Sequence, residues 1–459
     1  MTEGFAARLN AEYFGGRLTP AILRHLGSLE RAGREPQAFA ARMCRQMRDR
    51  AIPAEDFSGF LAWSAATFVP RLLPAAWNGA ILPITTPGRH RQLDEYLAHN
   101  PWHPVGLGDR ILDLGCGFPP VTTVELASRF PEASVTGVDP TPGRYLVRLP
   151  NGDQACFTAR LRVLYFQPGS NSPKRWHAMY ADPPATRDRF LASLRAVLPA
   201  LPRDPGVAGR ATRGGAVAIQ NPGLEDAPGN LAFRQAGIGS RISDRYDVIR
   251  VMNVLPYFDR VARDEARRWL HARLAEGGLL IAGVDGPETR HARYLVEQRE
   301  GRRVVARELA FSLDQIRPLE VTAFFALYDD DPDLRIFAEL INTLRNDRSF
   351  QRPFDLRMDA LQAREGFCAR GTNGYLGGSP GGLGATRRLA DASARIDRTL
   401  AREGFAELAA RVLRRHGYVA WVNCVGHVAV EPPRPTRPGR PRSPARGRPG
   451  REMESRRRI

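Results

Sequence analysis

Two aspartates and two glycines have the residue types and spacing that could hold a nucleoside. Asp113, Gly115 and Gly117 fall in "RILDLGCG", where a short apolar run ends in a turn. Asp139 ends the next apolar run, "ASVTGVD", about 20 residues after that turn. A glycine turn lets the backbone approach a ligand closely, and a carboxylate at the end of the next strand can accept both ribose hydroxyls. The pattern therefore predicts a nucleoside clamp.

The turn is a poor match for a dinucleotide. A pyrophosphate needs amide donors and the fingerprint Gly-x-Gly-x-x-Gly, whereas this turn has no third glycine and has Asp113 two residues before Gly115. A carboxylate there would repel phosphate and would suit a ligand with a positive end. S-adenosylmethionine carries an ammonium and a sulfonium and no phosphate, so the turn favours that cofactor.

The elements that must position these residues alternate between strand and helix from residue 110 to about 285. The apolar runs "RILDL", "ASVTGVD", "NLAFRQAGI", "RYDVIRVMNVL" and "LLIAGVD" are typical of strands. "PPVTTVELASRF" and "RDEARRWLHARLAEGG" have helical periodicity. This order predicts an α/β fold with a doubly wound, mostly parallel sheet.

Three segments together resemble the class I S-adenosylmethionine-dependent methyltransferases, which have a Rossmann-like fold. They are "ILDLGCG" with "VTGVDP", then "RYDVIRVMNVLPYFD", which also resembles the fourth strand of chemotaxis-receptor methyltransferases, and finally "LAEGGLLIAGVD". The resemblance covers residues 105 to 290 apart from a large insertion. It implies that S-adenosylmethionine is the cofactor.

The resemblance also implies a set of cofactor-binding positions. Asp113 and Asp139 would hold the amine and ribose ends, Gly237 and Ile238 would flank the adenine, and Asn253 would face the methyl group. The turn would add four residues: Gly115, Cys116, Gly117 and Phe118. Pro119 replaces a frequent third glycine, and Gly237 stands where an aspartate often bonds adenine.

The sequence identifies no catalytic base, and the reaction needs one only if the acceptor must lose a proton early. Methyl transfer from a sulfonium is an in-line displacement in which the enzyme mainly aligns the reacting atoms. Asn253, Tyr257 and Asp259 follow the fourth strand without forming a recognisable dyad. The nine histidines and five cysteines are scattered, so we expect no metal site.

The remaining chain divides, by composition and periodicity, into regions around this core. We expect a helical N-terminal cap over residues 1–104, a methyltransferase domain over 105–290, an insertion at about 141–214, an α+β region over 291–431 and a disordered tail over 432–459.

The segment 60–77 is the most apolar, but Pro70, Arg71 and Pro74 interrupt it. A helical hairpin is therefore favoured over a membrane span. The glycine-rich stretch 371–384 lacks a phosphate-loop signature and favours a mobile surface loop.

The charge distribution bears on possible partners, and the cysteine usage bears on the cellular compartment. The net charge is +18, but ten arginines and two glutamates in residues 434–459 supply +8 of it, and Lys174 is the only lysine. Arginine bias of this kind is typical of a GC-rich genome, so a nucleic-acid partner for the tail is the less favoured interpretation. With no signal-peptide pattern and no disulfide framework, we expect a cytoplasmic protein.

Three function hypotheses remain. The leading one is a methyltransferase acting on a small-molecule or metabolite acceptor, because the flanking regions would enclose a compact substrate. The second is a protein or nucleic-acid methyltransferase that docks its substrate through the basic tail. "ADPPA", with Asp182, resembles the Asp-Pro-Pro-Tyr signature of base-modifying enzymes but has Ala185 in place of the stacking aromatic residue. The third is a non-catalytic protein that binds S-adenosylmethionine.

Overall fold

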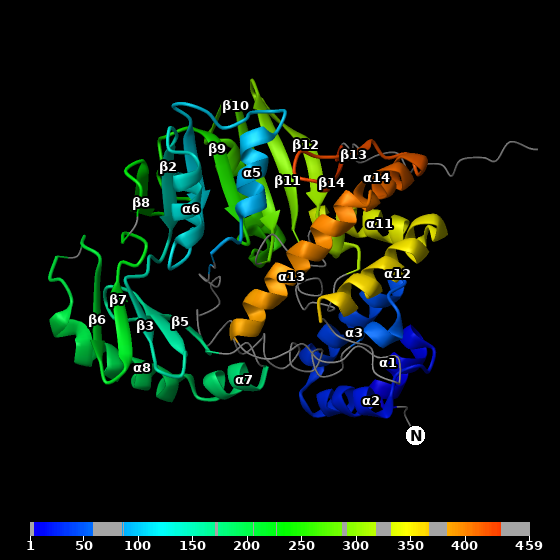
Figure 1. Cartoon of the computed structure of the whole chain (residues 1–459), viewed down its shortest axis with the longest axis horizontal. Coiled ribbons are helices and arrows are strands. Elements are labelled where there is room, and N and C mark those ends of the chain that lie inside the picture. Colours follow the sequence, from blue (N-terminus) through cyan, green and yellow to red (C-terminus); the bar gives the residue numbers. More distant parts are fainter. Residues whose placement is uncertain are drawn as a thin grey trace, which may run out of the picture.

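A computed structural model describes residues 4–57, 85, 87–169, 173–204, 206–225, 227–286, 292–317, 332–366 and 383–432. Its centre is a nine-stranded sheet with the order β13-β14-β12-β11-β10-β9-β1-β2-β8 (Figure 1). A second sheet, with the order β5-β4-β3-β7-β6, lies beside one end of the first. The chain therefore has a mixed α/β fold.

Five neighbouring strands of the main sheet run parallel. They are β8 (Leu231–Gln235), β2 (Ser134–Asp139), β1 (Arg110–Leu114), β9 (Tyr246–Met252) and β10 (Leu274–Val284). The chain goes from β1 outward to β2 and β8, then returns to the other side of β1 as β9 and β10. Strand order thus reverses at β1, and all five carboxyl ends meet at one edge.

The other four strands of the sheet are antiparallel. They are β11 (Arg293–Glu300), β12 (Arg303–Phe311), β14 (Val428–Val430) and β13 (Ala420–Val422). The alternation of residue types on both sides of Glu300 and Gly301 is typical of the hairpin that β11 and β12 form. The sheet is therefore parallel over one half only, because two hairpins from the C-terminal region extend it.

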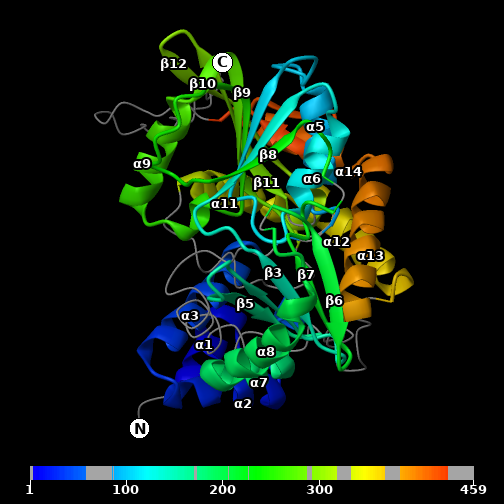
Figure 2. The ribbon, with the colours of Figure 1, turned by 90° about the vertical axis from the view of Figure 1, so that its left-hand side faces the viewer.

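Helices cover both faces of the parallel half, because its strand residues alternate between two apolar clusters (Figure 2). Ile111 and Val135 point toward α5 (Arg91–His99) and α6 (Val121–Arg129). Leu112 and Leu280 point toward α9 (Arg260–His271). Burial of both faces explains why these strands read as continuous apolar runs.

The second sheet falls largely within the expected insertion. Its strands are β3 (Tyr145–Arg148), β4 (Gln154–Phe157), β5 (Val163–Gln167), β6 (Gly209–Arg213) and β7 (Ala216–Gln220). All its pairs are antiparallel, including the β3–β4 hairpin that the Pro-Asn-Gly-Asp turn predicts. Two helices, α7 (Pro173–Ala181) and α8 (Pro183–Val197), complete its apolar core.

The N-terminal helices lie below the main sheet, and the C-terminal helices extend from them to the β13 end of the sheet, where α14 (Phe405–Arg415) lies beside β13 and β14 (Figure 1). The helices are α1 (Phe5–Phe14), α2 (Pro20–Gly27), α3 (Arg34–Asp49), α11 (Pro332–Asn346), α12 (Arg348–Arg364), α13 (Leu383–Arg402) and α14. The buried Arg317 joins the two groups by donating to the Asp56 carboxylate at 2.9 Å. Arg345 adds bonds to the carbonyls of Arg50 and Ala51.

Several expectations lie outside the described residues. They concern the helical hairpin at 60–77, nearly all of the glycine-rich stretch at 371–384 and the tail from 433 onward. The domain boundaries also stay predictions, although α5 packs on the main sheet rather than with α1 to α3. Among the helices that the structure describes, none is long and apolar enough to cross a bilayer.

Candidate functional site

The glycine turn after β1 folds directly onto the end of β2. The backbone N–H groups of Gly115 and Cys116 both donate to the carbonyl of Val138, at 2.9 and 3.1 Å. The N–H of Gly117 donates to Oδ2 of Asp139 at 3.3 Å. The structure therefore brings together the turn and the carboxylate that sequence spacing predicted to be partners.

Both glycines of the turn are in the left-handed region, with φ of 76° at Gly115 and 67° at Gly117. Other residues adopt this region only with strain. A Cβ on Gly115 would also lie 2.4 Å from Cγ2 of Val254, which follows β9. The turn is thus closely packed against the loop after β9, and residue 115 has no room for a side chain.

Asp139 lies half-buried at the carboxyl edge of the sheet. Its Oδ1 accepts from the N–H of Thr141 at 2.8 Å, so each carboxylate oxygen holds one backbone donor. Each oxygen keeps a second acceptor position. Burial raises the pKa of Asp139 above its ordinary value, while the two backbone donors oppose that shift. The group can still accept two hydroxyl donors, as a ribose would offer.

The loop after β8 adjoins the same carboxylate. The N–H of Ala236 donates to the backbone carbonyl of Asp139 at 3.1 Å, and a Cβ on Gly237 would lie 3.2 Å from Pro140. The N–H of Gly237 is already bonded to Oγ of Ser240 at 2.9 Å. Ile238 is half-buried against the α9 cluster. Backbone and apolar surface, rather than an acidic side chain, flank Asp139 on this side.

Asp113, which was expected to hold the amine end of the cofactor, forms an ion pair within the protein. It is buried, and Arg250 donates to both of its carboxylate oxygens at 2.8 Å. The hydroxyl of Thr123 adds a third bond at 2.5 Å. Asp113 and Arg250 are direct partners in the β1–β9 register, which explains the pairing. The carboxylate is therefore engaged with the protein and is not open to a ligand ammonium.

Arg250 is shared by a second buried carboxylate. Its Nη1 donates to Oδ1 of Asp94 on α5 at 2.6 Å. Burial raises the pKa of Asp94 to about 7, and the negative charge of Asp113 adds to that shift. Burial acts on Asp113 as well, but Arg250 and Thr123 hold its pKa below the ordinary value. One guanidinium thus neutralises Asp113 fully and Asp94 incompletely.

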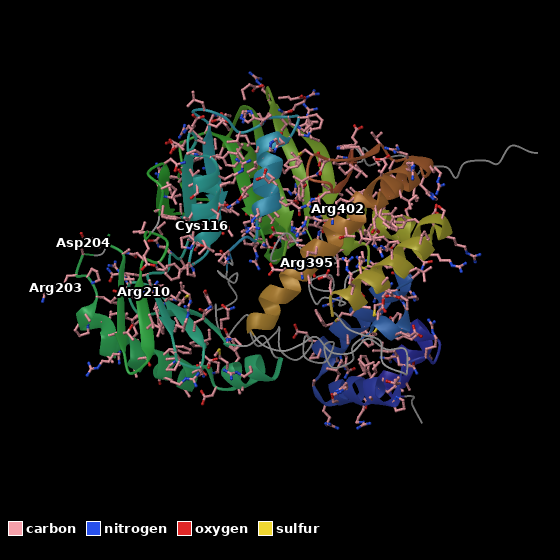
Figure 3. All side chains as sticks on the ribbon, in the orientation of Figure 1. Cys116, Arg203, Asp204, Arg210, Arg395 and Arg402 are labelled. Carbon is pink, nitrogen blue, oxygen red and sulfur yellow. The ribbon has the colours of Figure 1, made fainter. Side chains whose placement is uncertain are left out.

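The other two turn residues face the protein interior. The Cys116 thiol is buried, and burial together with Asp139 and Asp113 raises its pKa well above the ordinary value. The ring of Phe118 belongs to the core of the second sheet, and the Phe118 carbonyl accepts from the Tyr165 hydroxyl at 2.9 Å. Figure 3 shows Cys116 between the two sheets, with Arg210 on the outer side of the second one. Cys116 and Phe118 therefore hold the turn rather than present side chains to a ligand.

Asn253 lies at the end of β9, as expected, and has a left-handed backbone with φ of 58°. Its side-chain amide donates to Oδ1 of Asp285 at 2.9 Å and accepts from the Asp285 N–H at 3.1 Å. Oδ2 of Asp285 lies 2.7 Å from Nδ1 of His90, in a buried pair. Three polar residues from separate parts of the chain thus form one hydrogen-bonded chain at the carboxyl edge.

Four residues of this edge were missed by the sequence analysis: His90, Asp94, Arg250 and Asp285. Two of them carry a signal that could have been used. Arg250 interrupts an apolar run that must be buried, and a buried charge requires a partner. Asp285 follows an apolar strand just as Asp139 does. His90 and Asp94 carry no such local signal, because only the docking of α5 on the sheet brings them to the site.

The base-modifying signature is not reproduced. Asp182 precedes α8 and caps it, accepting from the N–H of Ala185 at 3.0 Å. Asp259, after β9, caps α9 in the same way. Both carboxylates therefore have ordinary helix-capping roles. Within the described residues, no group of three or more His, Cys, Asp or Glu side chains is arranged to bind a metal.

A small hollow lies beside the ends of β9 and β10. Leu255, Gly283 and Tyr294 form part of its wall, together with Arg263 and Arg267. Gly283 also accepts from the N–H of Asn253 at 2.8 Å, so the hollow adjoins the Asn253 end of the site. Neither the glycine turn nor Asp139 is among the described residues that line it, so we do not assign the nucleoside to it.

Comparisons with known proteins add a distant likeness to solved structures. No protein-family model matches the chain, and no curated protein matches it either. Among solved structures, the chain is similar to an S-adenosylmethionine-bound amino pentose methyltransferase from Micromonospora echinaspora, with 16% sequence identity and a TM-score of 0.20. The match covers 50% of this chain and 64% of that one. A likeness at this level carries no argument about function.

Proposed function

We propose that this protein binds S-adenosylmethionine and transfers its methyl group to a small-molecule acceptor. The observation that carries the proposal is the junction of the glycine turn with Asp139 at the carboxyl edge of β1 and β2. The strand order β8-β2-β1-β9-β10 supports it, because ligands of open α/β sheets bind where strand order reverses. That order is the one found in Rossmann-like folds.

The residues at this edge suit the adenosyl part of the cofactor. Asp139 would accept the ribose hydroxyls, the backbone of Gly115 and Gly117 would lie against the nucleoside, and Gly237 with Ile238 would border the base. Asp113 would act indirectly, by fixing Arg250 and the end of β1. The ammonium would then need another acceptor. The half-buried side chain of Asn253, directly after β9, has an amide oxygen that could accept from it.

When bound, S-adenosylmethionine supplies a methyl group on a positively charged sulfur. This chain's own residues would align the acceptor and keep water away from it. Asn253 and Asp285 lie at the strand ends next to the turn, and Asp285 is buried. Enclosed groups of this kind favour a compact acceptor over a nucleic-acid duplex or a folded protein.

Calorimetric titration tests the proposal directly. Wild-type protein should bind S-adenosylmethionine and S-adenosylhomocysteine but not NAD, because the turn lacks the third glycine of the dinucleotide fingerprint. Asp139→Ala should weaken S-adenosylmethionine binding by about 10-fold or more, the value of a lost hydrogen bond to a charged group. Asp264→Ala, at an exposed position of α9, is the matched control and should leave the affinity unchanged. Unaltered affinity in Asp139→Ala would refute the clamp.

Turnover separates an enzyme from a binding protein. S-adenosylhomocysteine should form from S-adenosylmethionine when the low-molecular-weight fraction of a cell extract is added, and deletion of residues 434–459 should leave that rate unchanged. If turnover instead requires the macromolecular fraction and the tail, the acceptor is a polymer.

A further inference from the structure

His90 and Asp285 form a buried pair that the proposed cofactor site does not use. The His90 side chain is 9% exposed and the Asp285 side chain is fully buried. Nδ1 of His90 is bonded to Asp285 at 2.7 Å, and no described residue is hydrogen-bonded to its Nε2. A buried imidazole with one nitrogen held by a carboxylate and the other unengaged has the arrangement of a general base.

The pair is held in place from several sides. His90 is the N-cap residue of α5, whose N-terminus is tied to the sheet by the Asp94–Arg250 bond. On the other side of His90, the N–H of Gly88 donates to both carboxylate oxygens of Glu125 on α6, at 2.9 and 3.0 Å. The imidazole is therefore fixed between α5, α6 and the end of β10. Such fixing suits a reacting group and is not required of an ordinary surface histidine.

The pair also adjoins the proposed cofactor site. Asp285 is bonded to Asn253, and the next residue, Val254, lies against Gly115 of the glycine turn. His90 is near enough to Asp113 for its charge to contribute to lowering the pKa of that carboxyl. The imidazole thus lies on the β9 and β10 side of the turn, opposite the ribose position at Asp139 across β1.

We propose that His90, oriented by Asp285, is the catalytic base, and that the acceptor is a compact molecule whose nucleophilic atom is a hydroxyl oxygen. This inference rests on the proposed function. The acceptor oxygen gives its proton to Nε2 of His90 as it takes the methyl group. The electron pair of the broken carbon–sulfur bond stays on the sulfur of the donor. Asp285 balances the positive charge that the imidazole gains.

The inference makes a prediction about equilibrium binding that needs no acceptor. If His90 faces the methyl position, its protonated form repels the sulfonium of S-adenosylmethionine but not the neutral sulfur of S-adenosylhomocysteine. The affinity of the first relative to the second should therefore fall by about 5-fold as His90 becomes protonated, a change that one like-charge pair can produce. The range to be scanned is about pH 5 to about pH 8.

Other charged groups near His90 must be separated from its effect. Asp285 after β10 is bonded to His90, and Asp113 on β1 is close enough for the two charges to interact. Arg250 on β9, together with Asp94 and Glu125 on the flanking helices, forms the bonds that hold the segment around His90, and His427 in the loop before β14 interacts with Asp285. Burial lowers the pKa of His427 to about 4, so it stays neutral over this range. Asp94, with its pKa raised to about 7, also titrates there, so Asp94→Asn is a necessary control.

The experiment is calorimetry of both ligands across this pH range with wild type, His90→Gln and Asp94→Asn. We expect the affinity ratio to depend on pH in wild type and in Asp94→Asn, and to be constant in His90→Gln, whose amide can still donate to Asp285. A ratio that is constant in wild type, or that varies equally in His90→Gln, overturns the role of His90. If wild type binds neither ligand, the proposed function itself has failed.

A second variant keeps the inference testable if His90→Gln does not fold. Asp285→Asn removes the carboxylate that stabilises the imidazolium, so the change in the ratio should move to lower pH. An unchanged pH dependence in this variant contradicts the proposed pair. Far-UV circular dichroism establishes that each variant is folded before the titrations are compared.

Discussion

The carboxyl edge of the main sheet and the interior of the second sheet are stabilised in different ways. At the carboxyl edge of the main sheet, the buried side chains are charged, with Arg250 between Asp113 and Asp94. The second sheet has an apolar interior in which Phe166 stacks on Phe190 and contacts Tyr180. Buried ion pairs contribute little net stability compared with apolar packing, but they fix positions and are costly to break. The difference indicates that the first region is built for a site and the second for support.

The largest effect is expected from removing the central charge. Arg250→Met leaves Asp113 and Asp94 buried without a counter-ion, which should cost about 3–5 kcal/mol of unfolding free energy. Urea unfolding followed by circular dichroism would measure it. S-adenosylmethionine affinity should fall as well, because Asp113 no longer fixes the end of β1. A loss below about 1 kcal/mol would contradict the importance given to this ion pair.

A matched change in the second sheet should affect stability alone. Phe190→Leu removes part of a fully buried aromatic cluster and should cost about 1.5 kcal/mol. Because the change lies away from Asp139 and His90, the affinity for S-adenosylmethionine should stay within about 2-fold of wild type, as calorimetry can measure. A large loss of affinity would show that the second sheet contributes to the site beyond the bond from Tyr165 to the glycine turn.

The effect of Asp94→Asn should depend on pH and should be smallest at low pH, where Asp94 is protonated in the folded state. The pKa of Asp94 is about 7 in the folded protein, against about 3.9 for an unfolded chain. Between these values the folded state binds more protons than the unfolded state, so this group lowers the unfolding free energy as pH rises. Wild type should therefore lose stability relative to Asp94→Asn from about pH 4 to about pH 7.

Above about pH 7 the difference between wild type and Asp94→Asn should be constant, because Asp94 is then ionised in both states. Unfolding free energies at matched pH values test this. A difference that stays constant between about pH 4 and about pH 7 would instead show that Arg250 neutralises Asp94 fully.

Much of the parallel half of the sheet could be predicted from the sequence. The runs that became β1, β2, β9 and β10 were recognised because strands buried on both faces are continuously apolar. The edge strand β8 was recognised from its residue types, although three of its five residues are exposed. The glycine turn and Asp139 were recognised from residue types and spacing, and the structure places them in contact. The antiparallel strands β13 and β14 were harder to place, because their partner β12 is remote in the sequence.

The candidate site likewise combines local features that the sequence predicts with contacts that only the tertiary structure reveals. The sequence by itself determined the local features, since the conformational freedom of Gly115 and Gly117 and the position of Asp139 after an apolar strand depend only on neighbouring residues. Only the tertiary structure decided that Asp113 is bonded to Arg250, and that His90 and Asp285 form a pair. Those contacts depend on strand register and on the docking of α5, which are set by the packing of the whole sheet.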